Sequence, residues 1–146
     1  MEKVVKYVAF DGAEFDYEDD CLDYELETRA KEYLEYFALY DCDRKPIKFC
    51  ADDQVLDRTC YIIIKAEKAV SFLDDWMIDY GCCRTIGKSA DYKNIENRVG
   101  LWMWDEKEEI WVHWETEIAK MRELGEYFQR FEETFKDLRN NFLQTP

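Results

Sequence analysis

Carboxylates are the side chains in this sequence best suited to chemistry, and they crowd its first quarter. Between Asp16 and Glu35 an acidic residue recurs every few positions. Pairs one helical turn apart, such as Asp19 and Asp23, could bind a divalent cation or act as acid and base. A catalytic centre of that kind would also need a phosphate-binding loop or a basic clamp, and neither is visible in a chain with five glycines. We therefore interpret the carboxylates as a charged surface and predict no catalytic residue.

Six cysteines and a single histidine are the other candidates for chemistry. The cysteines stand at positions 21, 42, 50, 60, 82 and 83, and none of their spacings matches a zinc site. A catalytic cysteine needs a base beside it. His113 falls within an aromatic strand, where a structural role is the commoner outcome. We predict neither a metal site nor a cofactor.

Four tryptophans, at positions 102, 104, 111 and 114, flank the acidic stretch DEKEE. Such a cluster could stack on nucleic-acid bases, but the acidic residues between the tryptophans would repel phosphate. Packing in the core or at a protein interface, where Trp is enriched, is the better interpretation.

A small set of helices and strands must position these residues. We expect a strand over Val4–Phe10, a turn at Asp11-Gly12 and only a brief strand at Glu14-Phe15. Asp16 is the predicted N-cap of a helix of about 20 residues reaching Tyr40. The apolar stripe that predicts this helix is Leu22, Leu26, Ala30, Tyr33, Phe37 and Tyr40.

The remaining elements follow in chain order. We expect an irregular segment over 41–57 with an edge strand at 47–49, and then a buried strand over 59–65. A helix over 66–80, capped by Gly81, and a loop over 82–97 follow. The chain then forms a hairpin of 98–104 with 110–115 and a long helix over 116–141. Ile118, Met121, Leu124, Phe128, Phe131, Phe135, Leu138 and Phe142 form the stripe of that last helix. The sequence thus predicts a single α+β domain over residues 1–146, with three helices on a small, mostly antiparallel sheet.

The net charge limits the classes of partner that the protein can bind. Thirty-four acidic against 20 basic side chains leave −14. This charge disfavours direct binding to nucleic acid or an anionic membrane, and it favours basic protein surfaces, including nucleic-acid channels. No apolar run reaches membrane-spanning length, and Met1-Glu2-Lys3 leads into a strand without a long apolar segment. We expect a cytoplasmic location with mostly reduced thiols.

Three segments stand out as a set. They are Lys6-Tyr7-Val8-Ala9-Phe10-Asp11-Gly12 with Glu14-Phe15, Cys21 and Tyr24-Glu25; the Tyr61–Lys65 strand followed by Ala66-Glu67 and a helix ending at Gly81; and the Trp-rich hairpin with its acidic turn. Together they resemble small acidic proteins encoded by phages and mobile elements of Gram-positive bacteria. The likeness spans roughly residues 1–115. Proteins of this style that have an assigned role include inhibitors of host defence, among them anti-CRISPR proteins, some of which imitate nucleic acid with carboxylates. The resemblance implies such a role and transfers no individual functional residue.

Our leading hypothesis is a non-enzymatic inhibitor that blocks a basic nucleic-acid site of a host nuclease. The predicted contact residues are Asp16, Glu18, Asp19, Asp20, Asp23, Glu27 and Glu35 along the first helix, with Asp105, Glu106 and Glu108 at the hairpin tip. A merely solvated helix face is the alternative for these carboxylates. The alternative function is an acidic homodimeric structural or regulatory module that associates through its aromatic surface, because the stripe of the last helix could pack against a second copy.

Overall fold

The computed structural model describes residues 4–82 and 84–144 of the chain. The chain divides into two compact units, Met1–His113 and Trp114–Pro146, and each is described by itself. The fold is α+β, as the sequence predicts, with helices and an antiparallel sheet in the first unit and a single helix in the second.

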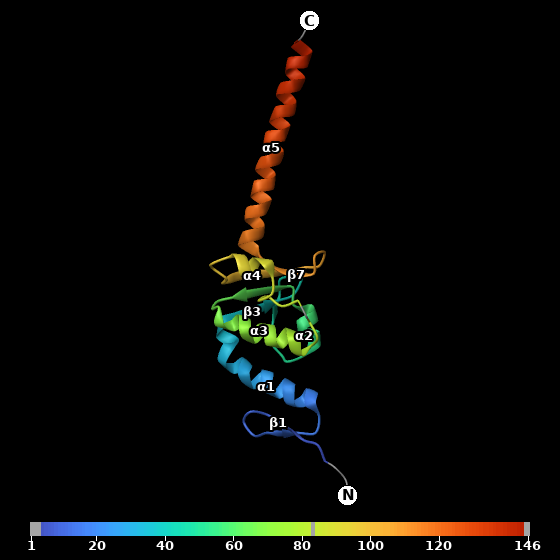
Figure 1. The fold of residues 1–146 in the computed structure, drawn as a ribbon, viewed down its shortest axis with the longest axis vertical. Helices are drawn as coiled ribbons and strands as arrows, with labels where there is room; N and C mark the ends of the chain where they lie inside the picture. Colours follow the sequence, from blue (N-terminus) through green and yellow to red (C-terminus); the bar gives the residue numbers. More distant parts are fainter. Residues whose placement is uncertain (1–3, 83, 145–146) are drawn as a thin grey trace. The chain divides into compact units, whose positions relative to one another are not determined.

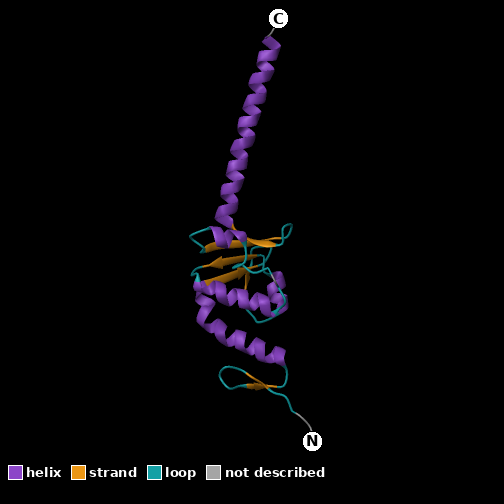
Figure 2. Ribbon diagram, in the orientation of Figure 1, coloured by secondary structure: helices purple, strands orange, loops and turns teal. Residues whose placement is uncertain are grey.

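The first unit is built on a five-stranded sheet in the order β4-β3-β5-β6-β7. Figure 2 shows the strands in orange, with helices beside them. The strands are β3 (Phe37–Tyr40), β4 (Pro46–Ile47), β5 (Tyr61–Ile64), β6 (Gly100–Asp105) and β7 (Ile110–His113). Every neighbouring pair is antiparallel. The predicted buried strand is confirmed as β5 at the centre, where Ile62 and Ile64 are fully buried.

A second, two-stranded sheet opens the chain. It pairs β1 (Tyr7–Val8) with β2 (Glu14–Phe15) around the predicted Asp11-Gly12 turn, where Gly12 has φ +91°. The predicted strand over Val4–Phe10 is thus shortened to two paired residues. Asp11 accepts hydrogen bonds from the backbone N–H of Ala13 and from the Tyr24 hydroxyl, which fastens this turn to the first helix.

The described residues of the first unit, 4–82 and 84–113, form four α-helices: α1 (Glu18–Tyr33), α2 (Asp53–Arg58), α3 (Lys68–Asp79) and α4 (Ala90–Asn94). In Figure 1, α3 lies between the sheet and α1. The three predicted helices are present as α1, α3 and a C-terminal helix, and two short helices, α2 and α4, form where the sequence predicts irregular segments. Each is too short to show a helical stripe, although Asp52 and Ser89 cap their first turns with side-chain hydrogen bonds.

The first helix is shorter than predicted. Tyr17, not Asp16, occupies the N-cap position, and α1 ends at Tyr33 before the 3₁₀ turn η1 (Leu34–Tyr36). Residues 37–40 form β3 because they pair with β5, Phe37 opposite Ile64 and Tyr40 opposite Tyr61. Strand pairing has overridden a spacing that also fitted a helix.

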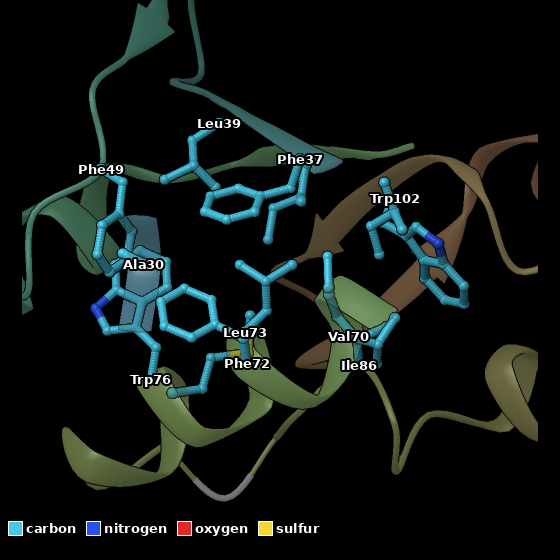
Figure 3. Packing of buried hydrophobic residues seen from close by; sticks show 14 of the residues in the cluster. Ala30, Phe37, Leu39, Phe49, Val70, Phe72, Leu73, Trp76, Ile86 and Trp102 are labelled. Carbon is cyan, nitrogen blue, oxygen red and sulfur yellow. The ribbon is translucent and has the colours of Figure 1, made fainter. Parts of the chain in front are cut away.

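An aromatic cluster fills the space between α3, α1 and the sheet (Figure 3). Phe72 and Trp76 of α3 meet Phe49, with ring centroids 5.4 and 4.9 Å apart. Phe37 of β3 adds a ring 5.9 Å from Phe72. The predicted end of α3 is confirmed, because Gly81 follows it with φ +77°.

A disulfide joins Cys42 to Cys60, with the two Cα atoms 5.2 Å apart. The expectation of reduced thiols is therefore wrong for this pair. The antiparallel pairing of Tyr40 with Tyr61 brings Cys42, two residues after β3, close to Cys60, the residue before β5, and a sequence separation of 18 gives no hint of that.

The second unit is the helix α5 (Trp114–Gln144), 31 residues long. It confirms the predicted helix over 116–141 and extends it at both ends. Trp114 begins this helix instead of continuing the hairpin strand. In the described part of the chain, no helix combines the length and apolar character needed to cross a membrane.

Candidate functional site

The carboxylates predicted on the first helix lie in its first turn, on one side of its first half, and in the turn that follows it. Asp16, Glu18, Asp19 and Asp20 are exposed at the start of α1, where the helix dipole stabilises negative charge. Asp20, Asp23 and Glu27, spaced by three and four, share one side of α1, and Glu18 lies on another side by the same helical period. The helix therefore does not present all of them on one face. Glu35 falls beyond α1, in η1.

Two of these predicted residues also hold the fold together. The Tyr80 hydroxyl donates a 2.7 Å hydrogen bond to Oδ1 of Asp23. The backbone N–H of Ala51 donates to Oε1 of Glu27. Asp23 thus connects α1 to the end of α3, and Glu27 connects α1 to the segment that leads into α2.

These contacts bring further carboxylates alongside α1. The pKa of Tyr80 is raised by burial and by the hydrogen bond to Asp23. The negative charges of Asp23, and of Asp52 and Asp53 at the start of α2, raise it further. Asp79, next to Tyr80, has a raised pKa because of burial and the nearby charges of Asp75, Glu25 and Asp23. We call Asp23, Asp52, Asp53 and Asp79 the Tyr80 acidic cluster.

Sequence reasoning missed three members of the Tyr80 acidic cluster. Asp52, Asp53 and Asp79 come from α2 and α3, and only packing places them near Asp23. The one available signal was the Asp52-Asp53 pair, which is typical of a helix start but was interpreted as part of a loop. Arg29 partly offsets the local charge through a 3.0 Å ion pair with Asp75.

A pocket of about 280 Å³ adjoins this cluster. Asp53, a member of the cluster, lines the pocket together with Tyr80. The other residues that line the pocket are Leu56, Asp57, Thr59, Met77, Gly81, Cys82, Trp104 and Trp111. The rings of Trp104 and Trp111 pack edge to face, with centroids 5.5 Å apart. Indole rings beside carboxylates form an environment that attracts organic cations such as guanidinium or ammonium groups.

The predicted acidic patch at the hairpin tip is separate from α1. Asp105 accepts hydrogen bonds from the backbone N–H groups of Lys107 (3.0 Å) and Glu108 (3.2 Å), so it closes the turn. Glu106 and Glu108 are exposed. Figure 1 shows this loop and α1 on different sides of the first unit, so the two predicted patches do not merge into one surface.

The hairpin tryptophans divide between core and pocket. Trp102 is fully buried, and its indole N–H donates to the backbone oxygen of Arg98 at 2.9 Å. His113, opposite Trp102 in the register, is 2% exposed, and its Nε2 lies 2.9 Å from the backbone oxygen of Val99. These contacts give both residues a structural role.

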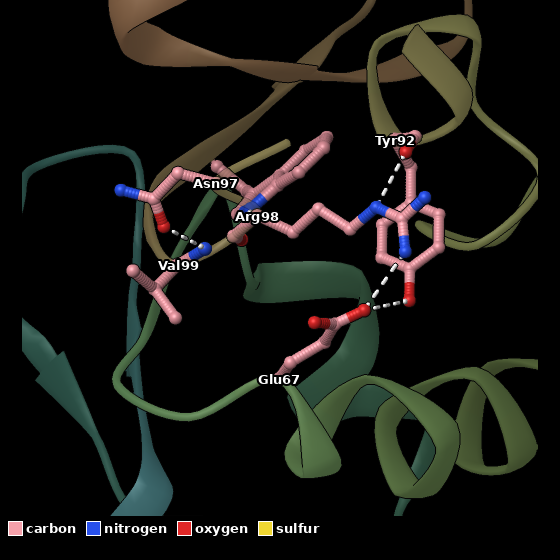
Figure 4. Close-up of polar contacts among 6 residues, drawn as sticks. Glu67, Tyr92, Asn97, Arg98 and Val99 are labelled. Carbon is pink, nitrogen blue, oxygen red and sulfur yellow. Dashed lines mark hydrogen bonds and ion pairs between the residues drawn. The ribbon is translucent and has the colours of Figure 1, made fainter. Parts of the chain in front are cut away.

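A polar network ties α3 to the segment before β6 (Figure 4). The Arg98 guanidinium lies 2.8 Å from Oε1 of Glu67, and the same oxygen accepts a hydrogen bond from the Tyr92 hydroxyl at 3.1 Å. Arg98 also covers the Tyr92 ring, 4.1 Å from its centroid. The Arg98 hydrogen bond, followed by that of Tyr92, lowers the pKa of Glu67. Glu67, Tyr92 and Arg98 bind one another within the first unit, so we interpret this polar network as structural.

Among residues 4–82 and 84–144, no group of three or more histidine, cysteine or acidic side chains is arranged to hold a metal ion. Comparison of this chain with protein-family models, curated proteins and solved structures gives no match. The candidate site is therefore defined by its geometry: the Tyr80 acidic cluster, the exposed first turn of α1 and the adjoining aromatic pocket.

Proposed function

We propose that this protein is a non-enzymatic, anti-CRISPR-like inhibitor that docks on a basic nucleic-acid-binding site of a bacterial defence nuclease. The observation that carries the proposal is the hydrogen bond from Tyr80 to Asp23, with the charges of Asp52 and Asp53 near the same hydroxyl, Asp79 next to Tyr80 in the chain, and an aromatic pocket beside them. A basic channel complements this surface in charge, whereas nucleic acid and anionic membranes are repelled by it.

The mode of action is competition with phosphate. Lysine and arginine side chains that hold a DNA or RNA backbone pair instead with Asp19, Asp20 and the Tyr80 acidic cluster. One of them enters the pocket, where its cationic head stacks on Trp104 and faces Asp53 and Asp57. Occupation of the channel then excludes the nucleic acid without any chemical step.

The first experiment identifies the partner. Full-length protein is used to capture binders from a bacterial lysate at low and high salt, and the bound proteins are identified by mass spectrometry. A nucleic-acid enzyme recovered only at low salt supports the proposal, because screening weakens charge pairing at a surface. Recovery of the same partner at both salt concentrations contradicts an electrostatic mode.

Charge reversal then tests the surface itself. The double variant Asp19→Lys/Asp20→Lys changes two exposed carboxylates at the start of α1, and Asp23→Asn removes a charge while keeping an oxygen for the Tyr80 hydroxyl. Each should weaken binding to the captured nuclease by about tenfold or more, measured by calorimetry. The matched control, Glu123→Lys/Glu126→Lys on α5, has the same net charge change as the double variant and should bind as the unmodified protein does. Equal losses in all variants would show that only net charge matters.

The proposed setting is the bacterial cytoplasm, where the Cys42–Cys60 pair would meet a reducing environment. The inhibition assay is therefore run with and without reductant. We expect inhibition in both, because neither cysteine lines the pocket or belongs to the Tyr80 acidic cluster.

A further inference from the structure

The helix α5 carries a row of large apolar side chains that are exposed along its length. Six of them, Met121, Leu124, Phe128, Phe131, Phe135 and Leu138, are each between 54% and 66% exposed. Isolated helices gain little stability from their own hydrogen bonds, and most helices are held by the packing of an apolar face. A row of this size indicates a surface that another element covers.

The spacing of the row identifies the kind of partner. The six residues are separated by three, four, three, four and three positions, which is the a/d pattern of a heptad repeat. Met121, Phe128 and Phe135 occupy a positions, and Leu124, Phe131 and Leu138 occupy d positions. A period of 3.5 keeps such a row facing one partner helix over three heptads, whereas a helix on a globular core follows a period nearer 3.6.

The flanking positions suit a second helix of the same sequence. The e positions are Gly125, Glu132 and Arg139, and the g positions are Lys120, Tyr127, Thr134 and Asn141. In a parallel pair, each g residue faces the e residue five positions later in the partner, which sets Tyr127 against Glu132 and Thr134 against Arg139. No two like charges oppose one another across this seam.

Two features of α5 itself favour self-association. Seven acidic and five basic residues give the helix a net charge of −2, although the whole chain carries −14. Charge repulsion between two copies is therefore weakest along this helix. A hollow of about 530 Å³ is lined by Gly125, Phe128, Gln129, Phe131, Glu132 and Phe135, and an apolar side chain of a facing helix can fill it as a knob fills a hole.

We propose that two copies of this protein associate through a coiled coil of their α5 helices, with the residue 121–138 row as the seam. The occupant of the apolar face is thus a second copy of this chain. The proposal is independent of the inhibitory function, because the Tyr80 acidic cluster belongs entirely to the first unit. A dimer carries two such clusters and gains avidity wherever two basic sites lie within reach.

The test measures the mass of the full-length protein in solution. Sedimentation and light scattering over a range of concentrations should give twice the 17.7 kDa of the chain at high concentration. High salt should leave the dimer intact, because the seam is apolar. A monomer at every concentration would overturn the proposal and indicate that α5 folds back on its own chain or awaits a different partner, and a trimer or tetramer would overturn the two-stranded form.

Two matched variants test the seam. Phe128→Glu/Phe131→Glu places charges at an a and a d position and should raise the dissociation constant at least about 100-fold. Arg130→Glu changes the net charge by the same −2 at an outward c position within the same turns, away from the residues that line the hollow, and should leave the dimer intact. The mass of the unmodified protein alone decides whether a dimer forms, so this result does not depend on whether a variant folds. Retention of the dimer by the seam variant would overturn the proposed interface.

Discussion

Asp74 shows how burial and hydrogen bonding compete at one carboxyl group. It lies on α3 and accepts hydrogen bonds from the backbone N–H groups of Ile86 and Gly87, both at 3.0 Å. Those bonds favour the charged form, yet burial dominates and raises the pKa of Asp74 to about 6. The group thus anchors the loop after α3 and titrates in an unusual range for an aspartate.

The pH dependence of stability should reveal this group. Because the folded pKa of Asp74 is above its unfolded value of 3.8, the folded state binds the proton more tightly. The resulting stabilisation is complete below about pH 4 and is lost as the pH rises through about 6. We expect it to amount to about 1 to 2 kcal/mol, since water still reaches this half-buried carboxyl.

The measurement is a carboxyl NMR titration, in which the Asp74 signal and the amide signals of Ile86 and Gly87 should share a midpoint near pH 6. In Asp74→Asn, the free energy of unfolding should lose this component of its dependence between pH 4 and 6. Asp43→Asn, which removes an exposed charge, serves as the control. An Asp74 midpoint near pH 4 would contradict the prediction.

Gly87 is required by the same carboxyl group. A β-carbon at this position would overlap Oδ2 of Asp74. Gly87→Ala should therefore lower the free energy of unfolding by about 1 to 3 kcal/mol, measured by urea denaturation followed through tryptophan fluorescence. Gly125→Ala on α5, where an added β-carbon meets no atom within 4 Å, should leave the unfolding of the first unit unchanged. A neutral Gly87→Ala would indicate that Asp74 can move aside.

At the scale of elements, strand pairing decides what the chain around β3 becomes. The backbone N–H of Lys65 donates to Tyr36 O at 2.7 Å, and that of Cys60 donates to Tyr40 O at 2.9 Å, so β3 is bonded to β5 along its full length. The same pairing brings Cys42 and Cys60 within disulfide reach. The disulfide therefore links the segment just after β3 to the residue just before β5.

Reduction of this disulfide should weaken the first unit. Closing a loop of this size restricts the unfolded chain, so we expect reductant to lower the free energy of unfolding by about 3 kcal/mol. Urea denaturation with and without reductant measures the difference, and non-reducing peptide mapping identifies the linked pair. The double variant Cys42→Ser/Cys60→Ser should show no response to reductant. Equal unfolding midpoints for the unmodified protein in both buffers would refute the expectation.

At the scale of the whole molecule, the two units differ in charge. Residues 1–113 carry 27 acidic and 15 basic side chains, a net charge of −12, whereas α5 carries −2. The first unit thus carries most of the net charge, and α5 carries the exposed apolar row. The two proposals predict different responses to salt, because docking on a basic site weakens with ionic strength and the coiled coil does not. Failure of one therefore leaves the other standing.

The sequence by itself determined the elements whose patterns are long or chemically strict. The period of the apolar residues predicted α3 and α5, the β-branched run predicted β5, and DEKEE between aromatic residues predicted the hairpin of β6 and β7. In α3, β5 and the hairpin, local preference and the side of burial agree, so one residue pattern is enough. The spacing of the α5 row was visible in the sequence, whereas its exposure was not.

Only the tertiary structure decided the rest. It ended α1 at Tyr33, because β3 gains hydrogen bonds from β5 that local spacing cannot foresee. It recruited Asp52, Asp53 and Asp79 to Asp23 and separated the hairpin tip from α1. The candidate site is made of exposed charges whose positions depend on how three helices pack, and exposed charges leave no periodic trace in a sequence. The composition predicted an acidic surface, and the packing of the helices determines which carboxylates lie close together.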